Sequence, residues 1–155
     1  MRVTTYKTLL DKDRKPQLVK EKTVNYTGVN AMQHPLEIAD VMNAIFNAKD
    51  CTEEHVWVIG MNTKMKPIGI IEVSHGLING SLVTPREVFT KVSLMGAIGF
   101  VLVHNHPSGD TSPSTEDIDI TKKIKECGKL MNIQLIDHLI IGEGYFSFEE
   151  HNCII

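Results

Sequence analysis

The chain has 155 residues and a mass of 17.3 kDa, a length that suits one domain with a substantial core. Apolar residues make up 42% and charged residues 23% of the chain, proportions that exclude a disordered or collagen-like protein. The formal net charge of −3 lacks the basic excess expected of a dedicated DNA-binding protein.

Membrane and disulfide-rich classes are also disfavoured. The longest apolar runs, such as 100–103, are too short to cross a bilayer, and the first residues contain no apolar signal core. Cys51, Cys127 and Cys153 lie far apart and form no C-x-x-C pair. We therefore expect a reduced, cytoplasmic protein with no membrane partner.

The N-terminal half of the chain predicts strands around one helix. Residues 2–10 and 17–26 have the composition of two short strands joined by a polar turn. Residues 35–48 begin with proline and carry apolar residues at helical spacing. Residues 54–61 and 68–75 then predict a second pair of strands joined by a turn.

The C-terminal half alternates helices and buried strands. The pattern predicts helices over 84–96 and 114–131, a fully buried strand over 98–103, and further strands over 133–141 and 145–148. Interleaved strands and helices indicate an α/β or α+β fold, with a mixed sheet flanked by helices.

Charge is concentrated in the first 25 residues, which carry a net +4 against −7 for the remainder. Solvated edge strands with protective lysines explain this pattern, and a basic arm that contacts an acidic partner or phosphate is the alternative. We expect residues 1–34 to form N-terminal strands or an arm of the same domain as residues 35–155.

Residues 104–117 concentrate the groups that can bind a metal. In an extended chain His104 and His106 point to the same side, with Cα atoms about 6.5 Å apart, so two ring nitrogens can reach one ion. Pro107 ends the strand, and Asp117 lies in the first turn of the next helix. Two histidines and one carboxylate leave one tetrahedral position open, as in catalytic zinc sites.

Simpler interpretations of these residues stay open. Ser114 can donate a hydrogen bond to a developing oxyanion, but Ser114 and Asp117 also form an ordinary helix-capping pattern. Two histidines at a strand end are often exposed or hydrogen-bonded rather than bound to metal. The metal interpretation depends on the joint order and tight spacing of these residues.

That joint pattern resembles a known family. Residues 104–117 fit H-x-H-P-S-G-x-x-x-P-S-x-x-D without a gap, and this is similar to the JAMM (MPN+) metalloprotease motif in the version carried by RadC-family proteins. The resemblance extends to residues 84–88 and 135–142 and covers roughly 35–150. It implies a JAMM/MPN fold of cytidine-deaminase-like architecture and one zinc ion held by His104, His106 and Asp117.

The family also uses a glutamate on an earlier strand as general base toward water and then as acid toward the leaving amine. By resemblance, Glu54 occupies that place. Glu53 faces the other way if the strand is regular, and Glu87 has a sufficient role as a helix cap. Glu72 lies in the middle of a strand, where a solvated face explains it equally well.

The remaining histidines carry weaker signals. His138, within the apolar run 135–141, is either a satisfied core histidine or a support for the metal ligands. The other four histidines have no ligand-like partner nearby in sequence, so no role follows for them: His34, His55, His75 and His151. Two glycines make segment 76–83 the candidate lid of the site.

Three functions follow from the resemblance. The first is zinc-dependent hydrolysis of peptide or isopeptide bonds by a metal-activated water, with catalytic Glu54 and Ser114. The second is a DNA-repair or recombination accessory, a role weakened by the acidic charge and by the lack of the family's N-terminal helix-hairpin-helix region in this short form. The third is a zinc-stabilised scaffold without turnover.

Overall fold

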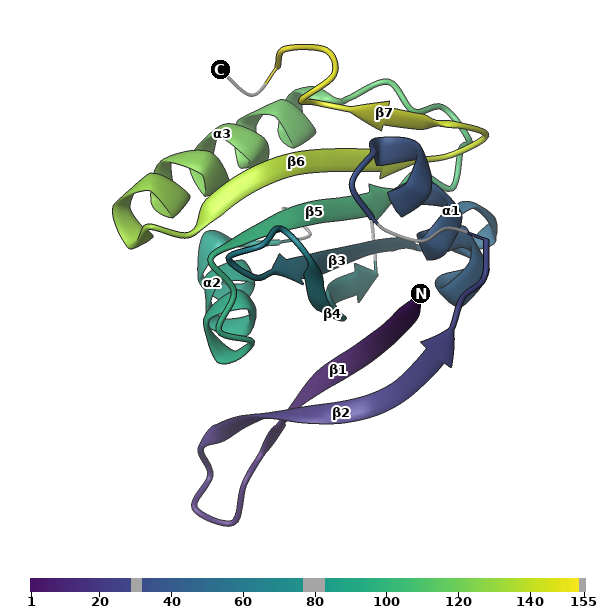
Figure 1. The fold of residues 1–155 in the computed structure, drawn as a ribbon. Coiled ribbons are helices and arrows are strands. Elements are labelled where there is room, and N and C mark those ends of the chain that lie inside the picture. The colour runs from purple at the N-terminus through teal and green to yellow at the C-terminus, as the bar shows by residue number, and fades with distance from the viewer. Residues whose placement is uncertain (29–31, 77–82, 154–155) are drawn as a thin grey trace.

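The computed structural model describes residues 1–28, 32–76 and 83–153, and within them seven strands form one mixed sheet (Figure 1). The strand order across the sheet is β2-β1-β4-β3-β5-β6-β7. The strands are β1 (Arg2–Leu10), β2 (Pro16–Asn25), β3 (Glu54–Met61), β4 (Pro67–Gly76), β5 (Gly99–Asn105), β6 (Gln134–Ile141) and β7 (Tyr145–Ser147). The helices are α1 (Pro35–Phe46), the 3-10 helix η1 (Ala48–Asp50), α2 (Pro85–Leu94) and α3 (Thr115–Met131).

Neighbouring strands pair in both directions. β1 with β4 and β5 with β6 are parallel, and the other neighbours are antiparallel. The parallel pair β5–β6 is joined by α3, because parallel neighbours need a crossover connection. The predicted fold class, a mixed sheet flanked by helices, is confirmed.

Helices cover the two faces of the sheet and create two apolar cores (Figure 1). On one face, Val41 and Met42 of α1 pack with Trp57 of β3 and its neighbours. On the other face, Val88 of α2 and Ile124 of α3 pack with the alternate residues of β3 and β5. β5 is buried on both faces, as its continuous apolar run predicts.

The predicted elements differ from the observed ones mainly at their ends. The first helix ends two residues early because Asn47 adopts the left-handed conformation, with φ 51°, and its N–H bonds to Asn43. β5 continues through His104 and Asn105, beyond the predicted end at 103, because Asn105 still pairs with Ile141 of β6. His104 therefore lies inside the strand, and only His106 follows it.

The two predicted N-caps are present. The Thr84 side chain accepts a hydrogen bond from the Glu87 N–H, and the Glu87 carboxylate accepts one from the Thr84 N–H at 2.9 Å. Ser114 and Asp117 form the same reciprocal box at the start of α3. These caps satisfy backbone donors that would otherwise have no partner, and they fix where each helix begins.

The sequence also leads us to expect no membrane-spanning helix and a lid over the site. None of the described helices combines the length and apolarity needed to cross a bilayer. The candidate lid is segment 76–83, and its residues 77–82 lie outside the described part of the chain.

Candidate metal centre

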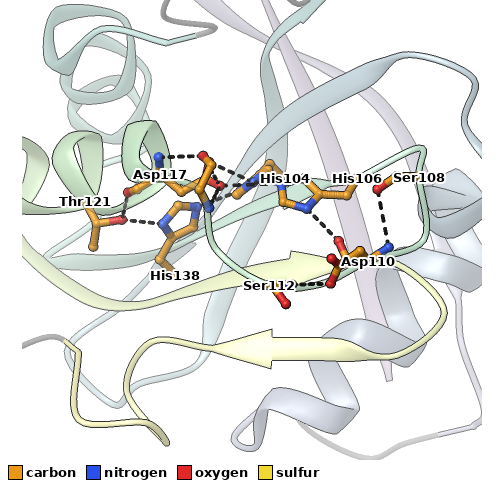
Figure 2. A network of polar contacts seen from close by, with 9 residues as sticks. His104, His106, Ser108, Asp110, Ser112, Asp117, Thr121 and His138 are labelled. Carbon is orange, nitrogen blue, oxygen red and sulfur yellow. Dashed lines mark hydrogen bonds and ion pairs between the residues drawn. The ribbon is translucent and has the colours of Figure 1, made fainter.

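Two consecutive structural elements bring His104, His106 and Asp117 together at one end of β5 (Figure 2). His104 Nε2 lies 3.0 Å from His106 Nε2 and 3.1 Å from Asp117 Oδ1, and His106 Nε2 lies 3.5 Å from Asp117 Oδ2. Tetrahedral zinc with ligand bonds of about 2.0–2.1 Å separates its ligand atoms by about 3.3 Å. The distances between the three predicted ligand atoms are therefore close to those between ligand atoms on one tetrahedral zinc ion.

The loop after β5 fixes which nitrogen of His106 carries hydrogen. His106 Nδ1 lies 2.7 Å from the backbone carbonyl of Asp110, and a carbonyl oxygen only accepts. Nδ1 is therefore the donor, and in the neutral ring Nε2 keeps its lone pair. Asp110 is held in turn by Ser108 Oγ, which accepts from its N–H, and by its own carboxylate, which accepts from the Ser112 N–H.

A chain of buried contacts fixes His104 in the same way (Figure 2). Thr121 Oγ1 donates to the carbonyl oxygen of Asp117, so Thr121 must accept the hydrogen of His138 Nδ1, 2.6 Å away. His138 is fully buried, and burial lowers the pKa of its ring well below the usual value, so the ring is neutral and its Nε2 accepts. His104 Nδ1, 2.8 Å from that nitrogen, therefore donates, and His104 Nε2 keeps its lone pair.

The neutral site thus brings two imidazole lone pairs and one carboxylate face to face with no hydrogen atom between them. Such an arrangement is repulsive unless a proton or a metal ion lies at its centre. In the metal-free chain the hydrogen bond to Asp117 raises the pKa of His106, which favours a proton there. Burial pushes the pKa of Asp117 upward, but once the histidines carry protons at Nε2 their hydrogen bonds to the carboxylate prevail and hold that pKa below its usual value.

This donor set fits a divalent ion of the zinc type, because neutral imidazoles and an ionised carboxylate are the forms that coordinate metal. If His104 binds a metal ion, the hydrogen-bonded chain that ends at it would act as outer partners of ligating histidines commonly do, since it fixes the ring and its tautomer. The structure thus favours the interpretation of His138 as support for His104, and His138 is at the same time a satisfied buried histidine.

Ser114 lies beside the carboxylate at the N-terminus of α3. Its Oγ donates to Asp117 Oδ2 at 2.6 Å and accepts from the Asp117 N–H at 3.1 Å. The capping interpretation is confirmed, and the hydroxyl hydrogen is engaged with Asp117 in this structure. Donation from Ser114 to a substrate oxyanion requires the hydroxyl to turn away from Asp117.

Glu54 begins β3 on the same side of the sheet as the candidate ligands. Val56 pairs with His104 in the antiparallel β3–β5 ladder, so Glu54 is level with His106 when the register is extended by two residues. The charge of Glu54 also contributes to the raised pKa of His106, after the larger effect of Asp117. Glu54 and the three candidate ligands line one cleft.

The cleft has a volume of about 510 Å³. It is lined by apolar side chains of the sheet, of α3 and of the segment before α2, and by charged residues of α3: Val56, Val83, Leu102, Ile120, Glu116, Asp119 and Lys123. A larger groove of about 1200 Å³ lies elsewhere, beside the C-terminal part of α3. That groove contains no histidine and none of the candidate site residues, so the smaller cleft is the candidate site.

Asn105 holds the backbone on both sides of Glu54. Its Oδ1 accepts from the His55 N–H at 2.7 Å, and its side-chain amide donates to the Glu53 carbonyl at 3.0 Å. Asn105 is fully buried. Sequence reasoning missed it, although the alternation of strand side chains already points residue 105 away from His104 and His106, and a buried amide there needs partners.

The other three candidates for the general base are not among the residues that line the cleft. Glu53 and Glu72 are not among its lining residues, and the carboxylate of Glu87 belongs to the cap of α2. Of the four candidates for the general base, Glu54 is thus the one that lines the cleft.

Comparison with known proteins agrees with the family suggested by the motif. The model of the RadC-like JAB domain matches residues 13–153. A UPF0758 protein of Clostridium acetobutylicum is 48% identical over 103 residues, which are 66% of this chain and 45% of that protein. A UPF0758 protein of Pelobacter propionicus is 41% identical over 121 residues, 77% of this chain and 52% of that protein.

The chain spans about half the length of the curated relatives that it matches, and their names state no activity. The matched region, residues 13–153, contains the motif at residues 104–117. The mixed sheet is the fold that the resemblance implies. This chain belongs to the family of RadC-like JAB domains.

Proposed function

We propose that this protein is a metal-dependent hydrolase that cleaves amide bonds in a peptide or isopeptide substrate, with one Zn²⁺ held by His104, His106 and Asp117. The observation that carries this proposal is the convergence of two neutral imidazole nitrogens and a carboxylate, 3.0–3.5 Å apart, in a cleft that also contains Glu54. Membership of the JAB family supports the same chemistry.

The metal, when bound, supplies Lewis acidity to a water molecule and to the substrate carbonyl. Glu54 accepts a proton from the attacking water molecule while the oxygen of that water bonds to the carbonyl carbon of the substrate. Glu54 then gives this proton to the nitrogen as the carbon–nitrogen bond breaks, so the products are a carboxylic acid and an amine. Its position opposite His106 suits both transfers.

The surrounding residues orient these groups. Asn105 fixes the backbone on either side of Glu54, and the His138–Thr121 pair fixes the ring of His104. Ser114 orients the Asp117 carboxylate and, after rotation of its hydroxyl, donates to the oxyanion that forms on the substrate.

The apolar walls of the cleft suit an extended peptide chain beside the reacting bond. Val56, Leu102 and Ile120 provide apolar contact, while Glu116 and Lys123 provide charge. This mixture is typical of sites in which a few polar groups orient a largely apolar contact.

The test compares Glu54→Gln with Glu53→Gln, in zinc-loaded protein, on a panel of fluorescence-quenched peptides and of dipeptides linked through a lysine ε-amino group. Both variants remove one carboxylate from adjacent residues, but only Glu54 lines the cleft. We expect Glu54→Gln to lower kcat by about 10²–10⁴-fold with zinc content unchanged, and Glu53→Gln to stay near the wild-type rate.

Equal turnover by Glu54→Gln and wild-type protein would contradict the proposed role of Glu54. A protein that binds zinc but hydrolyses none of these substrates would support a metal-stabilised scaffold instead of an enzyme.

A further inference from the structure

A second cluster of metal-ligating side chains lies on the opposite face of the sheet from the cleft. Its members are His55 of β3 and Glu72 and His75 of β4, whose ligand atoms all lie within 4.8 Å of one another. Glu72 Oε1 lies 3.3 Å from His55 Nδ1 and 2.5 Å from His75 Nδ1. We propose that these three residues form a second binding site for a divalent transition-metal ion such as Zn²⁺.

An irregularity in the β3–β4 ladder creates this cluster. Residues 72 and 75 of a regular strand would point to opposite faces, since their separation is odd. The register shifts between Val56 and Trp57, so that Val56 pairs with Ser74 while Trp57 pairs with Glu72. The extra residue on β4 brings Glu72 and His75 to the face that carries His55, as bulges commonly redirect a side chain.

The ring and backbone of His55 are held in place before any ion binds. Its ring stacks on Trp57, with centroids 5.2 Å apart and planes 9° apart, and Trp57 is buried in the core beneath α1. Its backbone N–H donates to Asn105. A fixed first ligand lowers the entropic cost of assembling the other two.

The remaining two ligands can adjust. The side chain of His75 is 63% exposed and that of Glu72 is 39% exposed, against 22% for His55. The distance between His55 Nδ1 and Glu72 Oε1 already equals the spacing of about 3.3 Å expected between ligand atoms on tetrahedral zinc. His75 Nδ1 lies closer to Glu72 Oε1 than this spacing, and its exposed side chain can adjust the distance.

The chemistry of the cluster suits such an ion. Two imidazoles and one carboxylate are ligands that zinc and its neighbours in the first transition series accept. A bound ion would also link β3 to β4 near Glu54, the first residue of β3. This second site shares no ligand with the cleft, so it is independent of the proposed hydrolase function.

The test is the zinc stoichiometry of the full chain, measured by calorimetric titration with Zn²⁺ after chelator treatment. The variants are His75→Ala, Glu72→Gln and the matched control His151→Ala, which removes another exposed histidine. We expect two equivalents for wild type and His151→Ala, and one for His75→Ala and Glu72→Gln. His106→Ala should also lose one equivalent, and the double variant His106→Ala/His75→Ala should lose both.

Cobalt substitution gives a second readout, because Co²⁺ in the His106→Ala background should still show d–d absorption that His75→Ala abolishes. The proposal is overturned if His75→Ala and Glu72→Gln bind as much Zn²⁺ as His151→Ala does. If the cleft fails to bind while this site succeeds, wild type takes one equivalent and His75→Ala none. That result would contradict the proposed function and support the second site.

Discussion

Thr121 is not among the residues that line the cleft, yet the metal site should depend on its hydroxyl. Thr121→Val keeps the shape of the side chain and removes only the oxygen. The change leaves the buried Nδ1–H of His138 without an acceptor, since that hydrogen is donated to Thr121 Oγ1 at 2.6 Å. His138 then loses the constraint on the tautomer that presents its Nε2 to His104.

Two magnitudes follow. A buried donor left unpaired costs about 1–3 kcal/mol, so the free energy of unfolding of the metal-free chain should fall by that amount. Loss of a group that orients a metal ligand lowers metal affinity by about 10–100-fold, which corresponds to about 1.4–2.8 kcal/mol. The zinc affinity of the cleft should therefore drop although all three ligands remain.

Thr90→Val is the matched control. Thr90 is exposed on α2, and its hydroxyl donates to the Arg86 carbonyl four residues earlier, as Thr121 donates to Asp117. Urea unfolding of the chelated proteins measures stability, and competition with a chromophoric chelator measures zinc affinity. If Thr121→Val matches Thr90→Val in both measurements, the proposed chain from Thr121 to His104 does not support the site.

Three further outcomes are expected. Asn105→Asp keeps the size of the side chain but removes the donor to the Glu53 carbonyl, so kcat should fall by more than about tenfold while zinc content stays at the wild-type level. Ser114→Ala should lower the free energy of unfolding by about 0.5–2 kcal/mol through loss of the cap, and a fall in kcat at constant zinc occupancy would add support for contact with the oxyanion. The hydrogen bond to Asp117 raises the pKa of His106 above 6.5, so this pairing stabilises the metal-free chain fully below pH 6.5. The stabilisation is lost as the pH rises through the raised pKa of His106. Urea unfolding at about pH 6 and about pH 9 should show this loss of stability in wild type and a smaller loss in Asp117→Asn.

Local patterns were sufficient to predict most elements and the candidate ligands. Alternation along β5 places His104 and His106 on one side, and the capping box at Ser114 sets the start of the helix that carries Asp117. These relations act over a few residues of chain, so spacing alone captures them. The end of β5 lies beyond the predicted one because it depends on the pairing of Asn105 with Ile141, which is distant in sequence.

The supports of the site connect separate elements, so the sequence alone leaves the role of His138 open between a core histidine and a support for the metal ligands. The contact of His138 with His104 depends on the parallel register of β5 and β6. The group of His55, Glu72 and His75 depends on a register shift between β3 and β4, which the sequence of neither strand reveals. Both features require the packed sheet.

The most direct test of the central claim is an anomalous-scattering map at the zinc edge, from crystals of protein incubated with zinc. We predict a peak within about 2.0–2.2 Å of His104 Nε2, His106 Nε2 and a carboxylate oxygen of Asp117. A map with no peak between these three side chains, from protein that binds zinc elsewhere or not at all, would contradict the account.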